Sequence, residues 1–241
     1  MNRPVQVFLA AGIATAPGFM EQFRRELHAK LEQVSGEVRS ELVYPYGNWN
    51  RSFPLQLWEA GHDLRRGAAG YRVSYGGARL LDMIAAREAE CDHPETPQTI
   101  LVGHSAGGTA VIHAALKLME RGRSAPPAKV IMVGSPRFRI PDKLSNHVHY
   151  LYTAVPADMI ARIGSFRGLR VRRQAPSAIT KLPIVGGHAD YFRNGDSFRN
   201  EDGRSNLQLT LNAVWTWLAD RMHAGERTGG ICSEVNRAAS D

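Results

Sequence analysis

The sequence predicts an α/β fold, in which a mostly parallel sheet of about six strands has helices on both faces. Short apolar runs alternate along the 241 residues with longer segments whose apolar residues recur every three or four positions. Two of the runs, TILV at residues 99–102 and KVIMV at residues 129–133, are apolar almost throughout, which is typical of central strands covered on both faces. This alternation of strand and helix is what a parallel sheet requires.

Six segments qualify as strands because each is a short run rich in residues that favour extended backbone. The expected strands, in chain order, are residues 5–10, 38–44, 99–102, 129–133, 148–152 and 169–172. Residues 134–147, between the fourth and fifth strands, are too few for a cap domain. We therefore expect a site that is open, or covered by loops around Phe138 and residues 164–166.

Between these strands lie segments whose apolar residues have helical spacing. In residues 106–121, Val111 and Ala115 lie on one face, and Gly122 provides a natural stop. The other expected helices are residues 19–34, two within residues 58–90 that break around residues 75–77, and residues 207–222.

Length and composition predict one domain. With 43% hydrophobic residues the chain can bury one sizeable core, and it is short for two catalytic domains. After Gly225 the chain has few apolar residues and two adjacent glycines. We therefore expect an α/β domain over residues 1–225 and a flexible tail over residues 226–241.

The charge balance is mildly basic, since 30 Lys and Arg against 23 Asp and Glu give a formal net charge of +7. Such an excess attracts anionic surfaces weakly, but no DNA-binding or RNA-binding motif accompanies it. No nucleic-acid partner is therefore expected. Five arginines fall within residues 162–173, and a solvated face is the favoured interpretation over an anion-binding patch.

Cysteine and histidine spacing argues against metal and disulfide chemistry. Cys91 and Cys232 are far apart, and the nine histidines include no HExxH pair, so no metal or other cofactor is expected. No apolar run approaches the ~20 residues that cross a bilayer, and the N-terminus is typical of a strand followed by a turn. These features favour a cytoplasmic protein with reduced thiols.

The decisive segment is TILVGHSAGG, in which an expected strand runs through Gly103, Ser105 and Gly107 directly into an expected helix. A serine in a tight, strained strand-to-helix turn is the nucleophile elbow of serine hydrolases. A Cβ two residues to either side of such a serine would collide with the neighbouring strand or helix, and glycine removes both clashes. The pattern therefore predicts Ser105 as a nucleophile at the positive end of the following helix.

A serine hydroxyl needs a histidine to take its proton and an acid to orient that histidine. In this architecture the chain order is serine, acid, histidine. Asp158 follows the fifth strand and His188 follows the sixth, in a glycine-rich loop, so both are expected at the carboxyl edge of the sheet. Asp142 and Asp190 are the alternatives for the acid, disfavoured because one follows the fourth strand and the other is expected in a helix after His188.

An oxyanion hole needs two backbone N–H donors. The first is expected from Ala106, the residue after the nucleophile, and the second from the loop after the first strand. In that loop Ile13 is the favoured donor, with Gly12 and Ala14 as alternatives. His104, inside the elbow, is expected to pack beneath the turn rather than to react.

Taken together, these segments resemble the α/β-hydrolase superfamily, and in particular the class 3 lipases. The matching segments are GHSAGG at residues 103–108, VGSPRF at 133–138, AVPADMI at 154–160 and HADYF at 188–192. The resemblance implies carboxylic ester hydrolysis without a cofactor, through a triad of Ser105, Asp158 and His188. It departs from the family after the first strand, where Ala11-Gly12 replaces the His-Gly pair of many hydrolases.

The sequence therefore predicts a serine esterase or lipase that acts on a small-molecule or lipid ester through an acyl-enzyme. A thioesterase or acyltransferase could use the same triad, and its arginines would then face a phosphate-bearing acyl carrier. A non-catalytic binding module is the third possibility, because a fold does not fix a function. Comparing acyl-CoA with simple esters separates the first two, and a fluorophosphonate probe that fails to label Ser105 would favour the third.

Overall fold

A six-stranded parallel sheet organises the chain, as predicted. The computed structural model describes residues 3–90, 96–122, 128–153, 158–166 and 175–235, with only the backbone described for residues 223–235. The strand order is β2-β1-β3-β4-β5-β6, and every neighbouring pair is parallel. The strands are β1 (Val5–Ala10), β2 (Val38–Val43), β3 (Gln98–His104), β4 (Lys129–Val133), β5 (Val148–Tyr152) and β6 (Ala178–Lys181).

The sixth strand differs from the prediction. The segment expected to form it, residues 169–172, lies outside the described residues, and the strand that pairs with β5 is β6, at Ala178–Lys181. This strand has four residues and lies at the edge of the sheet, where Ile179 is 49% exposed. A short edge strand needs no continuous apolar run, which is why the pattern missed it. Of the five arginines within residues 162–173, Arg162 is exposed and the others are not described.

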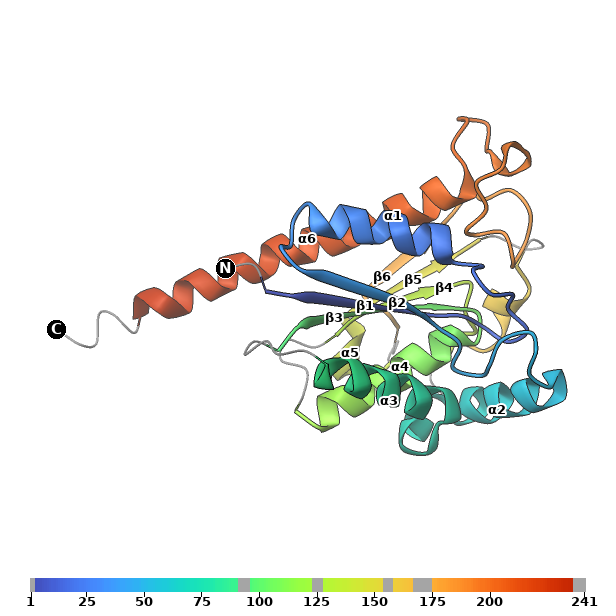
Figure 1. The fold of residues 1–241 in the computed structure, drawn as a ribbon, viewed down its shortest axis with the longest axis horizontal. Coiled ribbons are helices and arrows are strands. Elements are labelled where there is room, and N and C mark those ends of the chain that lie inside the picture. The colour runs from blue at the N-terminus through green and yellow to red at the C-terminus, as the bar shows by residue number, and fades with distance from the viewer. Residues whose placement is uncertain (1–2, 91–95, 123–127, 154–157, 167–174, 236–241) are drawn as a thin grey trace.

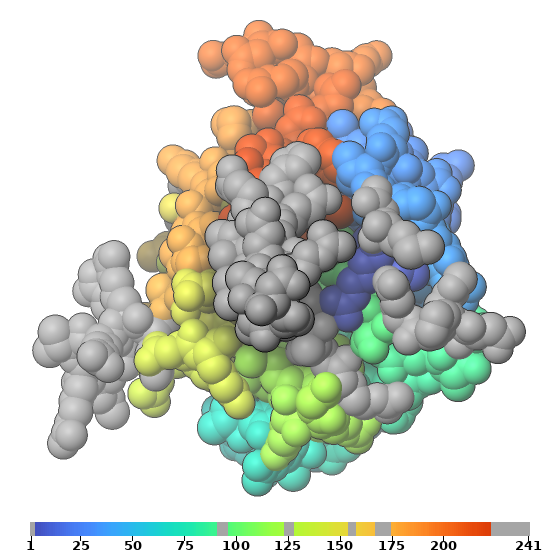
Figure 2. Space-filling model, turned by 90° about the vertical axis from the view of Figure 1, so that its left-hand side faces the viewer, coloured from blue at the N-terminus to red at the C-terminus, as the bar shows by residue number. Residues whose placement is uncertain are grey.

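Helices cover both faces of the sheet (Figure 1). One face carries α1 (Glu21–Glu32) and α6 (Asn206–Val235), and the other carries the remaining helices. Figure 2 looks onto the end where the strands begin, and the light-blue segment of α1 and the yellow-green segment of α4 lie on opposite sides of the molecule. Those remaining helices are α2 (Phe53–Arg66), α3 (Tyr75–Ala89), α4 (Gly107–Glu120) and α5 (Asp142–Ser145).

Alternate residues of the central strands supply two cores. On β1, Val7 and Leu9 face the core beneath α1 and α6, whereas Phe8 and Ala10 face the core beneath α3 and α4. Every residue of β1 is buried, because the strand has packed layers on both sides. This two-sided burial explains the nearly continuous apolar runs that identified the central strands.

The predicted break around residues 75–77 is placed differently in the structure. The chain breaks at the 3₁₀ helix η1 (Gly67–Val73), and α3 begins at Tyr75. The Ser74 hydroxyl caps α3 by accepting a hydrogen bond from the Gly77 N–H at 2.9 Å. Gly77 marks close packing rather than a helix end, because a Cβ there would lie 2.5 Å from the His113 Cβ on α4.

The C-terminal helix also extends beyond its predicted end, since α6 continues past residue 222 to Val235. The assignment of residues 226–241 to a flexible tail stays a prediction. Within the described part of the chain, no helix combines the length and the apolar character that a membrane span requires.

The strand order gives the sheet a topological switch point between β1 and β3. Chain connections run outward in opposite directions from this pair, since β2 lies beyond β1 while β4, β5 and β6 lie beyond β3. In open parallel sheets, ligands bind at the carboxyl ends of the strands at such a switch point. Ser105 follows β3 and Gly12 follows β1, so the predicted site occupies this position.

Candidate active site

Ser105 sits in a strained turn between β3 and α4. Its φ is 55°, in the left-handed region that residues with a side chain rarely adopt, and its N–H donates to the Val133 carbonyl at 3.1 Å. A Cβ at Gly103 would lie 2.4 Å from the Gly107 carbonyl oxygen, and a Cβ at Gly107 would lie 2.1 Å from the Ala10 carbonyl oxygen. The steric reason predicted for both glycines is thereby confirmed.

The turn presents the serine hydroxyl at the N-terminus of α4, where unpaired N–H groups and the helix dipole favour negative charge. Ala106 immediately precedes α4, and its N–H donates to no other described residue. The predicted donor at Ala106 is thus free to bind an oxygen that gains charge beside Ser105.

Asp158 and His188 lie in hydrogen-bond contact, although they are 30 positions apart in the chain. His188 Nδ1 is 3.0 Å from Asp158 Oδ1. The Asp158 side chain is fully buried, whereas that of His188 is 26% exposed. A carboxylate can only accept, so Nδ1 carries the proton of the neutral ring and the Nε2 lone pair stays available to accept a proton or a hydrogen bond.

The alternative acids lie elsewhere. Asp142 is exposed at the first position of α5, and Asp190 Oδ2 accepts the Gly187 N–H at 2.8 Å. Asp190 therefore holds the loop that carries His188 and does not contact its ring. Of the three candidates weighed from the sequence, Asp158 is the one that contacts the histidine.

Asp158 stays ionised because donors surround it. Burial raises the pKa of its carboxyl, but the hydrogen bond from His188, the Ala161 N–H at 3.0 Å and the Tyr191 hydroxyl at 2.8 Å outweigh burial and bring the pKa below its usual value. The Tyr191 hydroxyl in turn accepts the Thr153 N–H at 2.8 Å. This chain of hydrogen bonds fixes the carboxylate relative to the end of β5.

Tyr191 is a site residue that the sequence did not assign. It stands three positions after His188 and is completely buried. Burial, followed by the charge of Asp158, raises the pKa of its hydroxyl, so it acts as a hydrogen-bond donor at neutral pH. Nothing in the pattern separates such a tyrosine from an ordinary core residue, because its role depends on a contact with a distant loop.

His104 packs beneath the turn, as predicted, and links the elbow to His188. The two imidazole rings stack with centroids 4.8 Å apart, and His104 Nε2 is 3.0 Å from the His188 carbonyl oxygen. Burial, and then the neighbouring His188, lower the pKa of His104 to about 3, so its ring is neutral at neutral pH. A neutral ring donates to the carbonyl through Nε2–H and thereby holds the backbone of His188.

Ser105 lies beside this pair without a hydrogen bond to it. Among the described residues, the hydrogen bonds do not include one between the Ser105 hydroxyl and the His188 ring. His104, adjacent to Ser105 in the chain, nevertheless brings the His188 ring to the elbow through the stacked contact. Nucleophile–base hydrogen bonds are often long before substrate binds.

The loop after β1 contacts the other side of Ser105. A Cβ at Gly12 would lie 2.7 Å from the Ser105 Cβ, so glycine is required for this approach. Ala14 has a φ of 51°, and its N–H donates to Gln56 Oε1 at 2.8 Å. The Ala14 N–H therefore already has an acceptor, while the Ile13 N–H donates to no described residue. Ile13 and Ala106 both pack against the small cluster that contains Tyr46 and Ala60.

Gln56 is a second residue that the sequence did not assign. Besides accepting from Ala14, its amide donates to the Asn48 carbonyl at 2.7 Å and to the Arg51 carbonyl at 2.8 Å. The side chain is completely buried. Gln56 thus joins the loop after β1 to the loop after β2 and fixes the turn in which Ile13 lies.

The sequence did not assign Gln56 because α2 buries its polar residues. Gln56, Glu59 and Asp63 are buried, whereas Phe53 is 51% exposed and Trp58 is 58% exposed. An ordinary surface helix has the opposite arrangement. We call the exposed residues Phe53, Leu55, Leu57 and Trp58, together with Trp49 in the loop before the helix, the apolar face of α2.

Glu59 anchors the polar face of α2 through two ion pairs. Its carboxylate lies 2.5 Å from Arg51 and 2.7 Å from Arg79. Burial raises the pKa of Glu59, but the hydrogen bonds from Arg51 and Arg79 outweigh burial and lower the pKa to about 2. The pairs connect α2, α3 and the loop after β2, and so support the position of Gln56.

Replacing Glu59 with Gln is expected to lower the free energy of unfolding by about 3 kcal/mol near pH 7, because two guanidinium groups lose a buried partner. The folded pKa of about 2 lies below the ordinary value of 4.5, so the stabilisation is complete above the ordinary value and is lost as the pH falls through the folded value. The difference between wild type and Glu59→Gln should therefore shrink from near pH 6 to near pH 3, measured by urea unfolding.

A suitable control is Glu21→Gln, which removes the partly exposed pair with Arg24. This substitution should lower the free energy of unfolding by less than about 1 kcal/mol. A Glu59→Gln deficit that stays constant across the same pH range would contradict the ion-pair account.

No cap domain separates β4 from β5, as predicted, since residues 134–147 hold only the four-residue helix α5. Phe138 lies in the core between the sheet and α4, where its ring is 6.2 Å from that of His113. Phe166 packs edge-on against Tyr150, with the ring centroids 5.0 Å apart.

No known family model matches the chain, and no curated protein matches its sequence. Among solved structures, an acetylxylan esterase at 0.90 Å resolution is similar with a TM-score of 0.43 and 15% identity, over 75% of this chain and 82% of that chain. YbtT, a type II thioesterase from the yersiniabactin biosynthetic pathway, has a TM-score of 0.40 and 14% identity, over 79% and 87%. Similarity at this level does not establish an activity, and the chemistry is inferred from the site itself.

Proposed function

We propose that the protein is a serine hydrolase that cleaves carboxylic esters. The observation that carries the proposal is the buried carboxylate of Asp158, 3.0 Å from His188 Nδ1, at the same sheet edge as a serine with a φ of 55°. A partly exposed histidine oriented by a buried acid beside a strained serine is the arrangement that activates a hydroxyl for acyl transfer. The class 3 lipase resemblance points to the same three residues.

In the first half-reaction the Ser105 oxygen attacks the ester carbonyl, and its proton passes to His188 Nε2. The N–H groups of Ala106 and Ile13 bind the carbonyl oxygen as it becomes negative. The tetrahedral intermediate collapses when the C–O bond to the alcohol breaks and His188 returns the proton to the leaving oxygen. Water, deprotonated by His188, then attacks the acyl carbon, the bond to the Ser105 oxygen breaks, and His188 returns the proton to that oxygen as the acid is released.

Asp158 and His104 act on His188 in different ways. Asp158 keeps the proton on Nδ1 and stabilises the imidazolium that forms when Nε2 takes the serine proton. His104, neutral at neutral pH, holds the backbone of His188 without competing for that proton. The positive charge that develops on His188 is therefore balanced by one buried carboxylate.

The apolar face of α2 supports a substrate with an apolar acyl or alcohol group. The Trp49 N–H donates to the Thr15 carbonyl at 3.2 Å, so Trp49 lies against the loop that carries Ile13. Exposed Met159 follows Asp158 directly, and exposed Val185 precedes the glycines before His188. Exposed apolar side chains thus gather on the segments around Ser105, where burying them against a hydrocarbon chain is favourable.

The test is a series of p-nitrophenyl esters from acetate to decanoate, with octanoyl-CoA as the thioester. We expect turnover of the esters, with kcat/KM rising with chain length. In the double variant Trp49→Ser/Phe53→Ser, kcat/KM for the octanoate ester should fall about tenfold, because apolar contact area is lost, while that for the acetate ester stays within about twofold.

Val34→Ser, which changes an exposed apolar residue beyond the end of α1, serves as the control and should leave the whole series unchanged. Octanoyl-CoA hydrolysed much faster than every ester would favour the thioesterase alternative. No turnover of any substrate in the series would contradict the proposal.

A further inference from the structure

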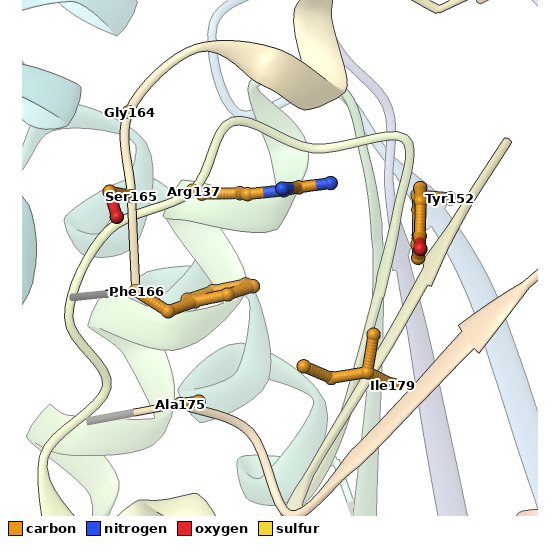
Figure 3. Close-up of a pocket in the computed structure, with 7 residues that line it drawn as sticks. All are labelled: Arg137, Tyr152, Gly164, Ser165, Phe166, Ala175 and Ile179. Atoms are coloured by element: carbon orange, nitrogen blue, oxygen red, sulfur yellow. The ribbon is translucent and has the colours of Figure 1, made fainter. Parts of the chain in front are cut away.

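A cavity that Ser105 does not line lies between the β4–α5 loop, the end of β5 and the edge strand β6 (Figure 3). Its volume is about 530 Å³, which is large enough for a small organic ligand. Arg137, Tyr152, Phe166 and Ile179 supply its main walls. None of these residues belongs to the proposed catalytic machinery.

Arg137 places an uncompensated positive charge in this cavity. The Cζ atom of its guanidinium lies 5.0 Å from the ring centroid of Tyr152 and 5.9 Å from that of Phe166. Its Nε lies 3.3 Å from the Tyr150 hydroxyl, and no carboxylate among the described residues pairs with it. Arg51 and Arg79, by contrast, share Glu59. The outer N–H groups of Arg137 are therefore available to an acceptor.

The backbone around Arg137 is held in place before any ligand arrives. The Arg137 N–H donates to the Ile163 carbonyl at 2.6 Å, and Arg137 forms a parallel bridge with Gly164. Gly164 has a φ of 79°, and a Cβ there would overlap the Arg137 carbonyl oxygen. This close approach fixes the backbone of Arg137, and the Tyr150 hydroxyl and the aromatic rings hold its guanidinium, so binding costs little ordering of the side chain.

Apart from Ser165 and the hydroxyl of Tyr152, the remaining walls are apolar. Figure 3 shows the guanidinium of Arg137 pointing towards Tyr152, with the Phe166 ring below it and Ile179 farther down the cavity. A ligand that fits would place an anionic group on the guanidinium and an apolar body along Phe166 and Ile179. One guanidinium balances one negative charge, and its planar fork matches a carboxylate.

We propose that the Arg137 pocket binds a small amphiphilic carboxylate, a monoanion with a hydrocarbon chain or ring. Hydrogen bonds also connect Arg137 with the segment that holds the acid. The Tyr150 hydroxyl, in contact with Arg137, lies 3.2 Å from the Ala161 carbonyl, and the Ala161 N–H donates to Asp158. Arg137 is therefore linked, through Tyr150, to the short helix η2 (Ile160–Arg162) that follows Asp158.

The test uses calorimetric titration of the full chain with octanoate, after fluorophosphonate treatment so that an acid bound at Ser105 does not contribute. Octanamide is titrated as the uncharged analogue of octanoate, and phenyl phosphate and inorganic phosphate are titrated as alternative anions. We expect octanoate to bind with the tightest affinity, and Arg137→Gln to weaken it about tenfold or more. Arg139→Gln, which changes an exposed arginine two positions away, should bind octanoate as wild type does.

Ile179→Trp provides a second variant, because it fills the cavity from an exposed edge position and leaves Arg137 intact. It should also weaken octanoate binding about tenfold or more, while far-UV circular dichroism reports an unchanged fold. Octanoate affinity unchanged in both variants, no octanoate binding to wild type, or tighter binding of either phosphate would overturn the proposal. Because the readout is binding at Arg137, it is independent of whether Ser105 proves to be the nucleophile.

Discussion

Replacing Ser105 with Ala is expected to reduce kcat on p-nitrophenyl esters by about 10⁵-fold or more. Without the hydroxyl no acyl-enzyme forms, and the oxyanion donors and bound substrate alone give a small residual rate over water. The substitution should leave the fold intact. The strained φ of 55° belongs to the turn, and alanine meets the same backbone with a smaller side chain. Steady-state kinetics of the purified variant, with unfolding followed in parallel, provide the measurement.

The matched control is Ser145→Ala, which removes a hydroxyl whose hydrogen bond goes to the Asp142 carbonyl in α5. Its turnover should stay within about twofold of wild type, because the site does not include α5. A Ser105→Ala variant that retains turnover similar to that of Ser145→Ala would show that the chemistry lies elsewhere.

Replacing Asp158 with Asn is expected to lower kcat by about 10⁴-fold, with a smaller effect on KM. An amide in this place can donate to Nδ1, which favours the ring tautomer whose proton sits on Nε2, and such a ring does not accept the serine proton. The amide also carries no charge to stabilise the imidazolium. Kinetics over a range of pH measure the loss, since an acid that acts through His188 alters the pH profile as well as the rate.

Asp142→Asn and Asp190→Asn separate this role from general effects of removing a carboxylate. Asp142 is exposed on α5, so its substitution should leave kcat unchanged within about twofold. Asp190 accepts the Gly187 N–H, so its loss should reduce activity modestly through the loop that carries His188. A loss in Asp142→Asn as large as that in Asp158→Asn would contradict the geometry.

The elbow and the central strands could be predicted from the sequence because their constraints are local. The residues around Ser105 must form a strand, a tight turn and a helix within a few positions, and the glycines leave a steric signature. The runs that form β3 and β4 are apolar because both faces of each strand are buried. Asp158 and His188 followed from the same logic, since the carboxyl ends of parallel strands meet at one edge.

The rest depends on contacts between distant segments. β6 is a four-residue edge strand with half of its residues exposed, so it carries no apolar run. α2 buries Gln56 and Glu59 and exposes Leu57 and Trp58, so the apolar residues of this helix do not mark its buried face. Helical periodicity says which residues share a face, but not whether that face meets an apolar core or a polar loop.

Within the candidate site, the proposed reacting residues can be predicted from the sequence more readily than the residues that position them. Tyr191 acts by donating to Asp158 from a loop 33 positions away, and Gln56 acts by accepting from Ala14. Neither residue type is diagnostic of such a role. Each role depends on which partner the buried polar side chain contacts in the folded protein.

The most direct test of the central claim is the site of fluorophosphonate labelling, mapped by mass spectrometry in wild type and in His188→Ala near pH 7.5. The account predicts one adduct on wild type, carried by Ser105, and labelling at least about 100-fold slower in His188→Ala because the base is missing. An adduct on another residue, or equal labelling rates in the two proteins, would show that Ser105 and His188 do not work as a pair.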